Sequence, residues 1–240
     1  MTEQFSRLAL LFGQSAVQKL SKMHVAVFGI GGVGGYVVEA LARSGIGMID
    51  LIDSDKVVLS NLNRQIIATH QTLGLLKTEA AQERILSINP NCKVQTHNVF
   101  FSPQNADLFD FKKYDYVADA IDSLGSKICL IEKAKAAGTP IISAMGAANK
   151  IYPERFEVAD IYQTSVCPVA KILRKELKKR GINNLKVVYS KEQPLVPNKT
   201  DEEGKVLGST AFTPPVVGLI IAAEIIKDLL NQHPGENNVF

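Results

Sequence analysis

Residues 24–53 read HVAVFGIGGVGGYVVEALARSGIGMIDLID, and this stretch decides the fold. Its first and last segments, 24–29 and 48–53, are short apolar runs typical of buried strands. Between them, residues 33–45 have the apolar spacing of a helix and end in a glycine. A strand, a helix and a second strand in this order predict a βαβ unit with parallel strands.

The same alternation continues along the rest of the chain. We expect strands at 93–98, 115–120, 140–145, 155–161 and 186–190, helices at 78–89, 127–138, 168–180 and 216–230, and a polar loop at 191–205. This order predicts an α/β fold with a Rossmann-like, doubly wound and mostly parallel sheet. Because the rhythm changes after Asn149, we expect an irregular C-terminal extension on the same sheet.

Composition sets the broad class of protein. The chain has 240 residues, of which 46% are hydrophobic, so it can bury the core of one large domain. Its start lacks the pattern of a secretory signal, and charged side chains interrupt helix 216–230, so we expect a cytoplasmic protein without a membrane span. A formal charge of +3 is compatible with an anionic partner and too small to identify one.

The glycine-rich loop of the βαβ unit predicts a nucleotide site. Gly29, Gly31 and Gly34 form GxGxxG, with Gly32 as an extra glycine, between a strand and a helix. Glycines let a phosphate approach the backbone, and the helix N-terminus favours its charge. Asp53 ends the next strand, where a carboxylate can accept ribose hydroxyls. The loop alone does not decide whether the ligand is NAD or ATP, or whether the glycines serve only to pack the strand against the helix.

The residues after Asp53 favour chemistry at a phosphoryl group. The connection 53–65 reads DSDKVVLSNLNRQ, and Lys77 starts the next helix. Arg64 and Lys77 can neutralise charge that builds up on phosphate, and a carboxylate can hold Mg²⁺. We expect that carboxylate to be Asp122, just past a strand end where ligand sites of such sheets gather. Taken singly, each of these residues is an ordinary solvated loop side chain.

Five motifs together resemble a known family. They are FSRLALLFG at 5–13, GIGGVGG at 29–35, LIDSDKVVLSNLNRQ at 51–65, GLLK at 74–77 and DAIDS at 119–123. In this order they resemble the ubiquitin-activating superfamily, the ThiF and MoeB type of adenylating enzymes. The resemblance implies one adenylating domain over 1–240, with a nucleotide-binding half at 1–150 and a substrate and dimer half at 151–240.

The resemblance also implies the roles of site residues. The nucleotide-binding set is Gly29, Gly31, Gly32, Gly34, Asp53, Asp55, Asn61, Arg64, Gln65 and Lys77. The catalytic set is Arg7, Arg64, Lys77 and Asp122, with Asp122 as the Mg²⁺ ligand and ATP as the nucleotide. Arg7 matches an arginine that in this family reaches into the neighbouring subunit's site, which implies a homodimer.

Departures from the ThiF and MoeB pattern narrow the resemblance to one branch. The two CxxC pairs that usually hold zinc are absent, and Ser123 stands where an asparagine is usual. The stretches 146–161, 175–182 and 189–194 instead look like the tRNA threonylcarbamoyladenosine dehydratases. That branch implies ATP-dependent adenylation of the carboxylate of a modified adenosine beside the anticodon, then ring closure with net dehydration, releasing AMP and pyrophosphate. It also implies a bound K⁺ or Na⁺ and cysteine-desulfurase-type sulfur-transfer partners.

The expected helix at 168–180 carries a cationic strip. Five basic residues fall at helical spacing, namely Lys171, Arg174, Lys175, Lys178 and Lys179, and Val169, Ile172, Leu173 and Leu177 form the opposing apolar stripe. Such a strip can neutralise phosphates of tRNA, although an ordinary solvated face has the same pattern.

Other readings stay open from the sequence. An activator of a ubiquitin-like or sulfur-carrier protein is the main alternative, with Cys167 in a loop as its thioester cysteine. Cys92 and Cys129 fall in a strand edge and a helix, where small buried thiols are common. A nucleotide-binding subunit without activity fits less well because the arginines, lysine and aspartate of the site are present. An NAD dehydrogenase fits least, for want of an acid-base histidine.

Overall fold

The computed structural model describes residues 3–195 and 207–231, and these residues form a seven-stranded sheet in the order β3-β2-β1-β4-β5-β7-β6. The strands are β1 His24–Phe28, β2 Met48–Ile52, β3 Lys93–His97, β4 Tyr116–Asp119, β5 Ile141–Ala144, β6 Phe156–Asp160 and β7 Lys186–Ser190. All neighbours pair in parallel except β6 and β7, which are antiparallel. The Rossmann-like sheet with a C-terminal extension is therefore confirmed.

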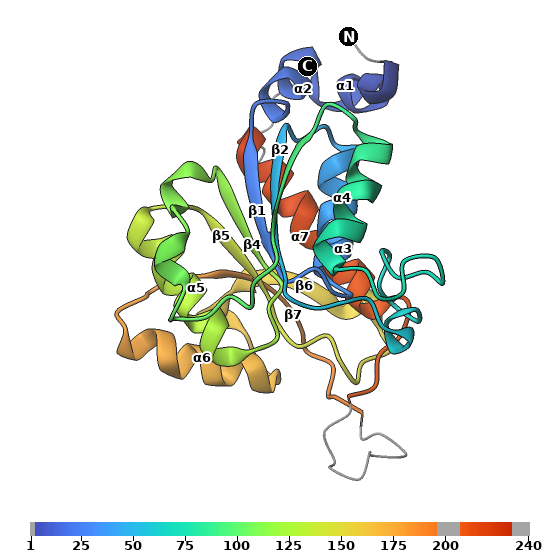
Figure 1. Ribbon diagram of the computed structural model, residues 1–240. Coiled ribbons are helices and arrows are strands. Elements are labelled where there is room, and N and C mark those ends of the chain that lie inside the picture. The colour runs from blue at the N-terminus through green and yellow to red at the C-terminus, as the bar shows by residue number, and fades with distance from the viewer. Residues whose placement is uncertain (1–2, 196–206, 232–240) are drawn as a thin grey trace.

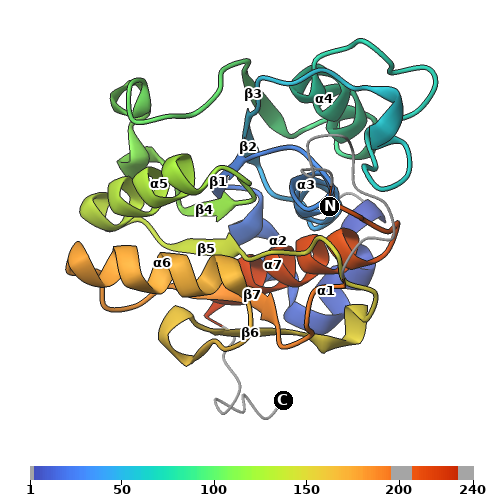
Figure 2. The same cartoon turned by 90° about the horizontal axis from the view of Figure 1, so that it is seen from below.

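Helices cover both faces of the sheet (Figures 1 and 2). They are α1 Ser6–Phe12, α2 Gln14–Leu20, α3 Gly34–Arg43, α4 Lys77–Ile88, α5 Leu124–Ala137, α6 Pro168–Lys179 and α7 Thr213–Leu230. Helices α3, α4 and α7 lie on one face, and α5 and α6 lie on the other. Each face has its own apolar cluster, so the sheet is buried on both sides as its near-continuous apolar strands require.

The close approach of α7 to α3 holds the start of α3 in place. Gly218 lies so near Val33 that a Cβ at residue 218 would come within 2.3 Å of the Val33 carbonyl oxygen. Only glycine permits this contact, and it fixes the end of the glycine-rich loop against α7. Helix α7 is a core element, because Val217, Ile221 and Ile225 are fully buried.

No helix in the described ranges is both long and apolar enough to cross a membrane. The expected polar loop at 191–205 lies partly outside the described residues, which stop at 195 and resume at 207.

Candidate active site

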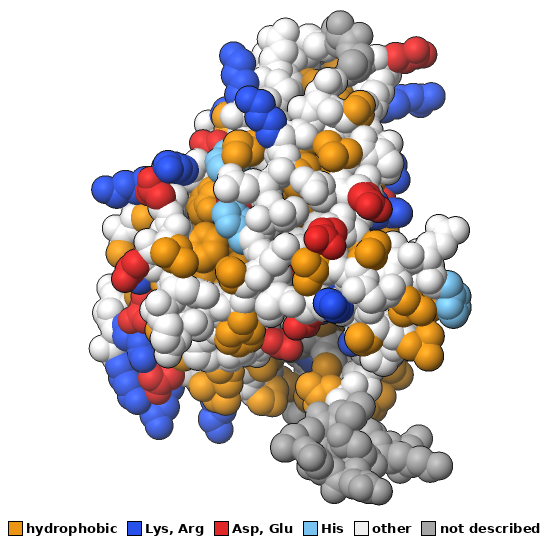
Figure 3. All heavy atoms as spheres, in the orientation of Figure 1, with side chains coloured by type: hydrophobic (Ala, Val, Ile, Leu, Met, Phe, Trp, Pro, Cys, Tyr) orange, Lys and Arg blue, Asp and Glu red, His pale blue; other side chains and the backbone are white. Residues whose placement is uncertain are grey.

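A cavity of about 810 Å³ opens at the carboxyl ends of the central strands. It is lined by residues that follow β1, β2, β4 and β5, by residues 61–65, and by the start of α7. Ligand sites of open α/β sheets form at this edge because the connections to helices on opposite faces leave a crevice there. In the space-filling view the hollow lies below the centre of the molecule (Figure 3).

The glycine-rich loop forms one wall of the cavity, and its glycines have two different jobs. Gly34 is needed for packing, since a Cβ there would lie 1.7 Å from the Gly29 carbonyl oxygen. At Gly31 a Cβ would meet only Gln65 Nε2, at 3.8 Å, and would otherwise project into open space. Gly31 therefore lets a ligand approach the backbone, as expected for a phosphate-binding loop.

Asp53 fixes the shape of that loop. Its carboxylate accepts hydrogen bonds from the backbone N–H of Ile30 at 2.7 Å and of Asp55 at 2.8 Å. Each carboxylate oxygen keeps a second acceptor site, so a ribose hydroxyl can still donate to Asp53. The side chain thus both orders the loop and lies at its edge of the cavity.

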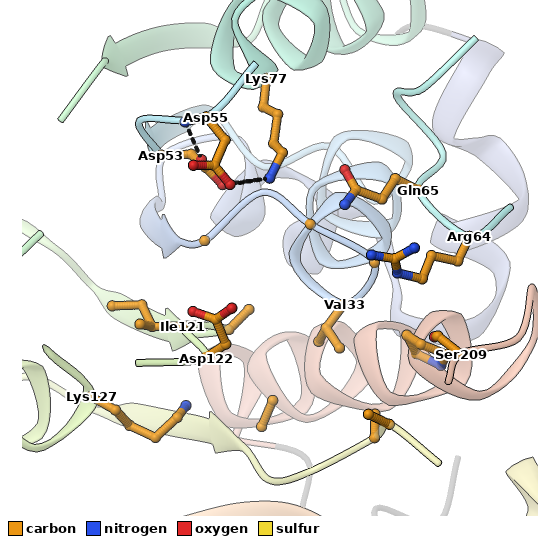
Figure 4. Close-up of a pocket in the computed structure, with 18 of the residues that line it drawn as sticks. Val33, Asp53, Asp55, Arg64, Gln65, Lys77, Ile121, Asp122, Lys127 and Ser209 are labelled. Atoms are coloured by element: carbon orange, nitrogen blue, oxygen red, sulfur yellow. Dashed lines mark hydrogen bonds and ion pairs between the residues drawn. The ribbon is translucent and has the colours of Figure 1, made fainter. Parts of the chain in front are cut away.

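Lys77 starts α4 and is paired with two carboxylates. Its Nζ lies 2.6 Å from Asp55 Oδ2 and 4.0 Å from Asp53 Oδ2 (Figure 4). The lysine side chain is 8% exposed, whereas that of Asp55 is 64% exposed. The pairing holds the ammonium group at the cavity wall, where an incoming phosphate can take over from the exposed carboxylate.

Arg64 lies on the same wall without a carboxylate partner among the described residues. Its guanidinium donates to the Ser60 carbonyl at 2.8 Å and to Asn63 Oδ1 at 2.7 Å. Asn61 is buried and its Oδ1 accepts from Val58 N–H at 3.2 Å, so it holds the turn that presents Arg64. The guanidinium charge is left for an anion.

Asp122 faces this cationic wall from the other side of the cavity (Figure 4). It follows β4, is exposed, and has no hydrogen bond or ion pair with any described residue. Within the described ranges, no three metal-ligating side chains cluster together. A single free carboxylate opposite two cations suits Mg²⁺, which takes one or two carboxylates and completes its shell with phosphates and water.

The donors and acceptors of the cavity fit a nucleoside triphosphate. Gln65 Oε1 is buried at the wall and has no hydrogen-bond partner among the described residues, which points to a ligand or ordered water. The lining carries three carboxylates and three cations, so its own charge is balanced. A polyphosphate therefore needs additional positive charge, which a metal ion or a neighbouring subunit would supply.

Part of the cavity lining has no charged side chains. It comprises the backbone and small side chains of residues 144–148, together with Val169 and Leu207. Sequence reasoning missed it, because small apolar residues after a strand carry no chemical signal. It also missed three buried polar residues beneath Asp122, namely Asp119, Lys127 and Ser143.

Arg7 lies away from the cavity of its own chain. It is an exposed residue of α1, and α1 lies beyond the end of the sheet from which β1 starts, opposite the cavity (Figure 1). The predicted action of Arg7 in a site therefore requires a second chain.

Helix α6 presents a cationic strip narrower than expected. Lys171, Lys175, Lys178 and Lys179 are exposed, and Lys and Arg gather over α6 in Figure 3. Arg174 instead donates to the Thr164 carbonyl at 2.9 Å and to its hydroxyl, so it pins the preceding loop.

The apolar stripe on α6 also differs from the expectation. Its buried residues are Ala170, Leu173 and Leu177, whereas Ile172 is 45% exposed. At 100° per residue, Ile172 falls more than 120° from the centre of the buried stripe and lies among the lysines.

Cys167 is buried, which corrects the expectation of a reactive loop cysteine. It is 1% exposed, and its Sγ would lie 3.9 Å from a Cβ built at Gly146. Cys92 and Cys129 are buried as expected, and burial raises the pKa of the Cys92 thiol to about 11. None of the three thiols is placed to carry an acyl group to a protein partner.

The chain belongs to the ThiF family, whose sequence pattern matches residues 5–240. It is 40% identical to the tRNA threonylcarbamoyladenosine dehydratase of Bacillus subtilis over 97% of this chain and 96% of that protein. Crystal structures of Escherichia coli tRNA N6-threonylcarbamoyladenosine dehydratase, TcdA, superpose with TM-scores of 0.89 for the complex with AMP and 0.88 for the complex with ATP. Both are 34% identical to this chain and cover 96% of it and 95% of their own length.

Proposed function

We infer that this chain is an ATP-dependent enzyme that adenylates the carboxylate of threonylcarbamoyladenosine in tRNA and closes it into a ring with net loss of water. The observation that carries the inference is the cavity lining, which combines the glycine-rich loop and the charged Arg64, Lys77 and Asp122 with the small uncharged residues 144–148. The full-length similarity to dehydratases supports the same reaction.

The first step is attack of the substrate carboxylate on the α-phosphorus of ATP. A carboxylate oxygen forms the new P–O bond, the bond to the β-phosphate oxygen breaks, and pyrophosphate leaves. Arg64 and Lys77 lie where they can stabilise the charge that moves onto the leaving phosphates. A nucleophilic atom of the same modified nucleoside, already tethered to the activated carboxyl, then attacks it, the ring closes, AMP leaves, and a proton is lost. Tethering supplies the proximity that a covalent enzyme intermediate would otherwise provide.

Asp122 would hold Mg²⁺ against the phosphates, and the metal would supply positive charge to the leaving group. A K⁺ or Na⁺ ion and desulfurase-type partners follow from the family resemblance alone and stay predictions. A reaction that consumes ATP and modifies tRNA is expected in the cytoplasm.

A homodimer completes the site in this proposal. The balanced charge of the cavity lining and the distance of α1 from it both support an Arg7 supplied by a second chain. Mixing inactive Arg7→Ala and Arg64→Ala chains tests this, because one site of each heterodimer then keeps both arginines. Recovery of part of the activity is expected, and no recovery in verified heterodimers would refute the exchange of Arg7.

The remaining exposed lysines of α6 are the proposed tRNA surface. The helix that carries them begins at the cavity, because Val169 in its first turn lines the cavity. Phosphates of the anticodon arm would bind along the exposed side of this helix.

The decisive experiment is ATP–pyrophosphate exchange with and without tRNA that carries threonylcarbamoyladenosine. Stimulation by the modified tRNA, together with loss of one water from the nucleoside by mass spectrometry, is the expected result. Stimulation by a small glycine-ended protein instead would favour the alternative of a protein activator. Cys167→Ser separates the two further: it should keep dehydratase activity, since the buried thiol has no role in the proposed reaction.

A further inference from the structure

Beneath Asp122 lies a buried ion pair that the proposed reaction does not use. Asp119, the last residue of β4, is 0% exposed, and Lys127 on α5 is 2% exposed. Lys127 Nζ lies 2.8 Å from Asp119 Oδ1, and the Ser143 hydroxyl donates to Oδ2 of the same carboxylate. The group thus ties together the ends of β4 and β5 and the first turns of α5.

Asp119 also holds the loop that carries Asp122. The backbone N–H of Ile121 donates to Asp119 Oδ1 at 3.2 Å. On the other side of Asp122, Lys127 N–H donates to the Ser123 carbonyl at 2.9 Å. The short segment that bears Asp122 is therefore held at one end by the Asp119 side chain and at the other by the backbone of α5. Lys127 and Asp122 lie on the same side of the cavity in Figure 4.

The buried pair is not explained by stability alone. Removing two charges from water costs about as much as their attraction returns, so a well-packed apolar pair would serve the core equally well. An apolar pair, however, would leave the Ile121 N–H without its acceptor. Lys127 also pairs with Asp119, the second carboxylate near the site. Asp122 is therefore the carboxylate that stays available to a metal ion.

We propose that Asp119 is a positioning residue for the metal-holding carboxylate of Asp122, and that Lys127 neutralises Asp119 and keeps it from binding the metal itself. The proposal rests on the metal role of Asp122 inferred above. Asp119 acts through the backbone of Ile121, as outer residues commonly orient the ligands of metal sites.

The test measures Mn²⁺ binding, by electron paramagnetic resonance, to the full chain in the presence of a non-hydrolysable ATP analogue. Asp119→Leu with Lys127→Met removes both charges and the acceptor, and it is expected to weaken Mn²⁺ binding about 10- to 100-fold, the usual effect of losing an outer-shell partner. Asp119→Asn with Lys127→Met keeps an acceptor for Ile121, and its Mn²⁺ affinity is expected to stay within about threefold of the unmodified chain. Binding of the analogue without metal should not change in either variant.

A control removes another Asp–Lys pair, which lies on the opposite face of the sheet and is more exposed. Lys186 Nζ lies 2.7 Å from Asp228 Oδ1, between β7 and α7, and neither residue lines the cavity. Lys186→Met with Asp228→Asn should leave Mn²⁺ affinity unchanged.

Each outcome decides one point. Unchanged Mn²⁺ affinity in the folded Asp119→Leu variant would overturn the positioning role. If that variant does not fold, Ser143→Ala replaces it, with an expected loss of about tenfold, the lower end of the same range, and an affinity within about threefold of the unmodified chain would overturn the role equally. Asp122→Ala is the reference: if it keeps Mn²⁺ affinity, the metal role itself fails, whatever the Asp119 variants do. None of these measurements involves tRNA, so they stand apart from the test of the proposed function.

Discussion

Gly31 offers the sharpest test of how the glycine-rich loop binds ATP. An added Cβ at Gly31 would meet only Gln65 Nε2 at 3.8 Å, which is ordinary van der Waals contact, so Gly31→Ala should fold normally. The same methyl group would occupy the space through which a phosphate reaches the backbone N–H groups. Loss of one charge-assisted hydrogen bond costs about 1.5–3 kcal/mol. Since 1.4 kcal/mol is tenfold in Kd, the Kd for ATP should rise about 10- to 150-fold.

Two other glycines provide the controls. At Gly34 a Cβ would lie 1.7 Å from the Gly29 carbonyl oxygen, so Gly34→Ala should cost roughly 4 kcal/mol or more and lower Tm by about 8–16 °C. Gly125 lies in α5 with nothing within 4 Å of its added Cβ, and Gly125→Ala should raise stability by up to ~1 kcal/mol without affecting ATP.

Isothermal titration with ATP and thermal unfolding measure the two effects separately. We expect Gly31→Ala to bind ATP more weakly at an unchanged Tm. We expect Gly34→Ala to have a lower Tm. An unchanged Kd for ATP in folded Gly31→Ala protein would show that phosphates do not approach the loop at this residue.

Three further predictions concern stability and tRNA. Burial raises the pKa of Asp50, but hydrogen bonds from two histidine rings outweigh it and hold the pKa at about 2. The ionised group stabilises the fold above its ordinary pKa of 3.8, and this contribution disappears as pH falls from about 4 to about 2. Asp50→Asn should therefore cost about 2 kcal/mol in urea unfolding at pH 6, and the difference should vanish near pH 2. Replacing Lys175, Lys178 and Lys179 with Gln should make log K for tRNA binding depend less steeply on log salt concentration. The slope should fall by about 0.7–0.9 for each phosphate that a lysine no longer neutralises, while ATP affinity stays unchanged. An unchanged slope would show that these lysines form an ordinary solvated face. Asn149 has φ of 57° and its side chain accepts from the Gly208 N–H, so Asn149→Ala should lower Tm, and Asn149→Gly should lower it less because glycine tolerates this φ.

The sequence predicted the nucleotide wall well because of how parallel strands are arranged. Residues that directly follow neighbouring parallel strands meet at one edge of the sheet, whatever their separation along the chain. Asp53 after β2 and Asp122 after β4 therefore had to lie near the glycine loop after β1, and the structure brings them there. Order along the chain was enough for this part of the site.

The parts that the sequence did not predict depend on packing between distant segments. In the sequence, Lys127 is indistinguishable from the other polar residues of its helix. Its burial against Asp119 follows only from the packing of α5 on β4. The sequence predicted that α6 is a helix, but not that Ile172 is exposed or that Arg174 bonds to a loop from outside the helix. Cys167 was correctly assigned to a loop, yet its burial is decided by the chain at Gly146.

The two lysine–aspartate pairs at the site differ in a way that separates their roles. Lys77 is 8% exposed, whereas its partner Asp55 is 64% exposed, so the Asp55 carboxylate can turn into water when another anion approaches. A phosphate can therefore displace Asp55 at little cost and take over the ammonium group. Lys127 and Asp119 are 2% and 0% exposed, and breaking a buried pair leaves an uncompensated charge. In the proposed reaction Lys77 would exchange Asp55 for a phosphate, whereas Lys127 would keep Asp119 and so support the segment that bears Asp122.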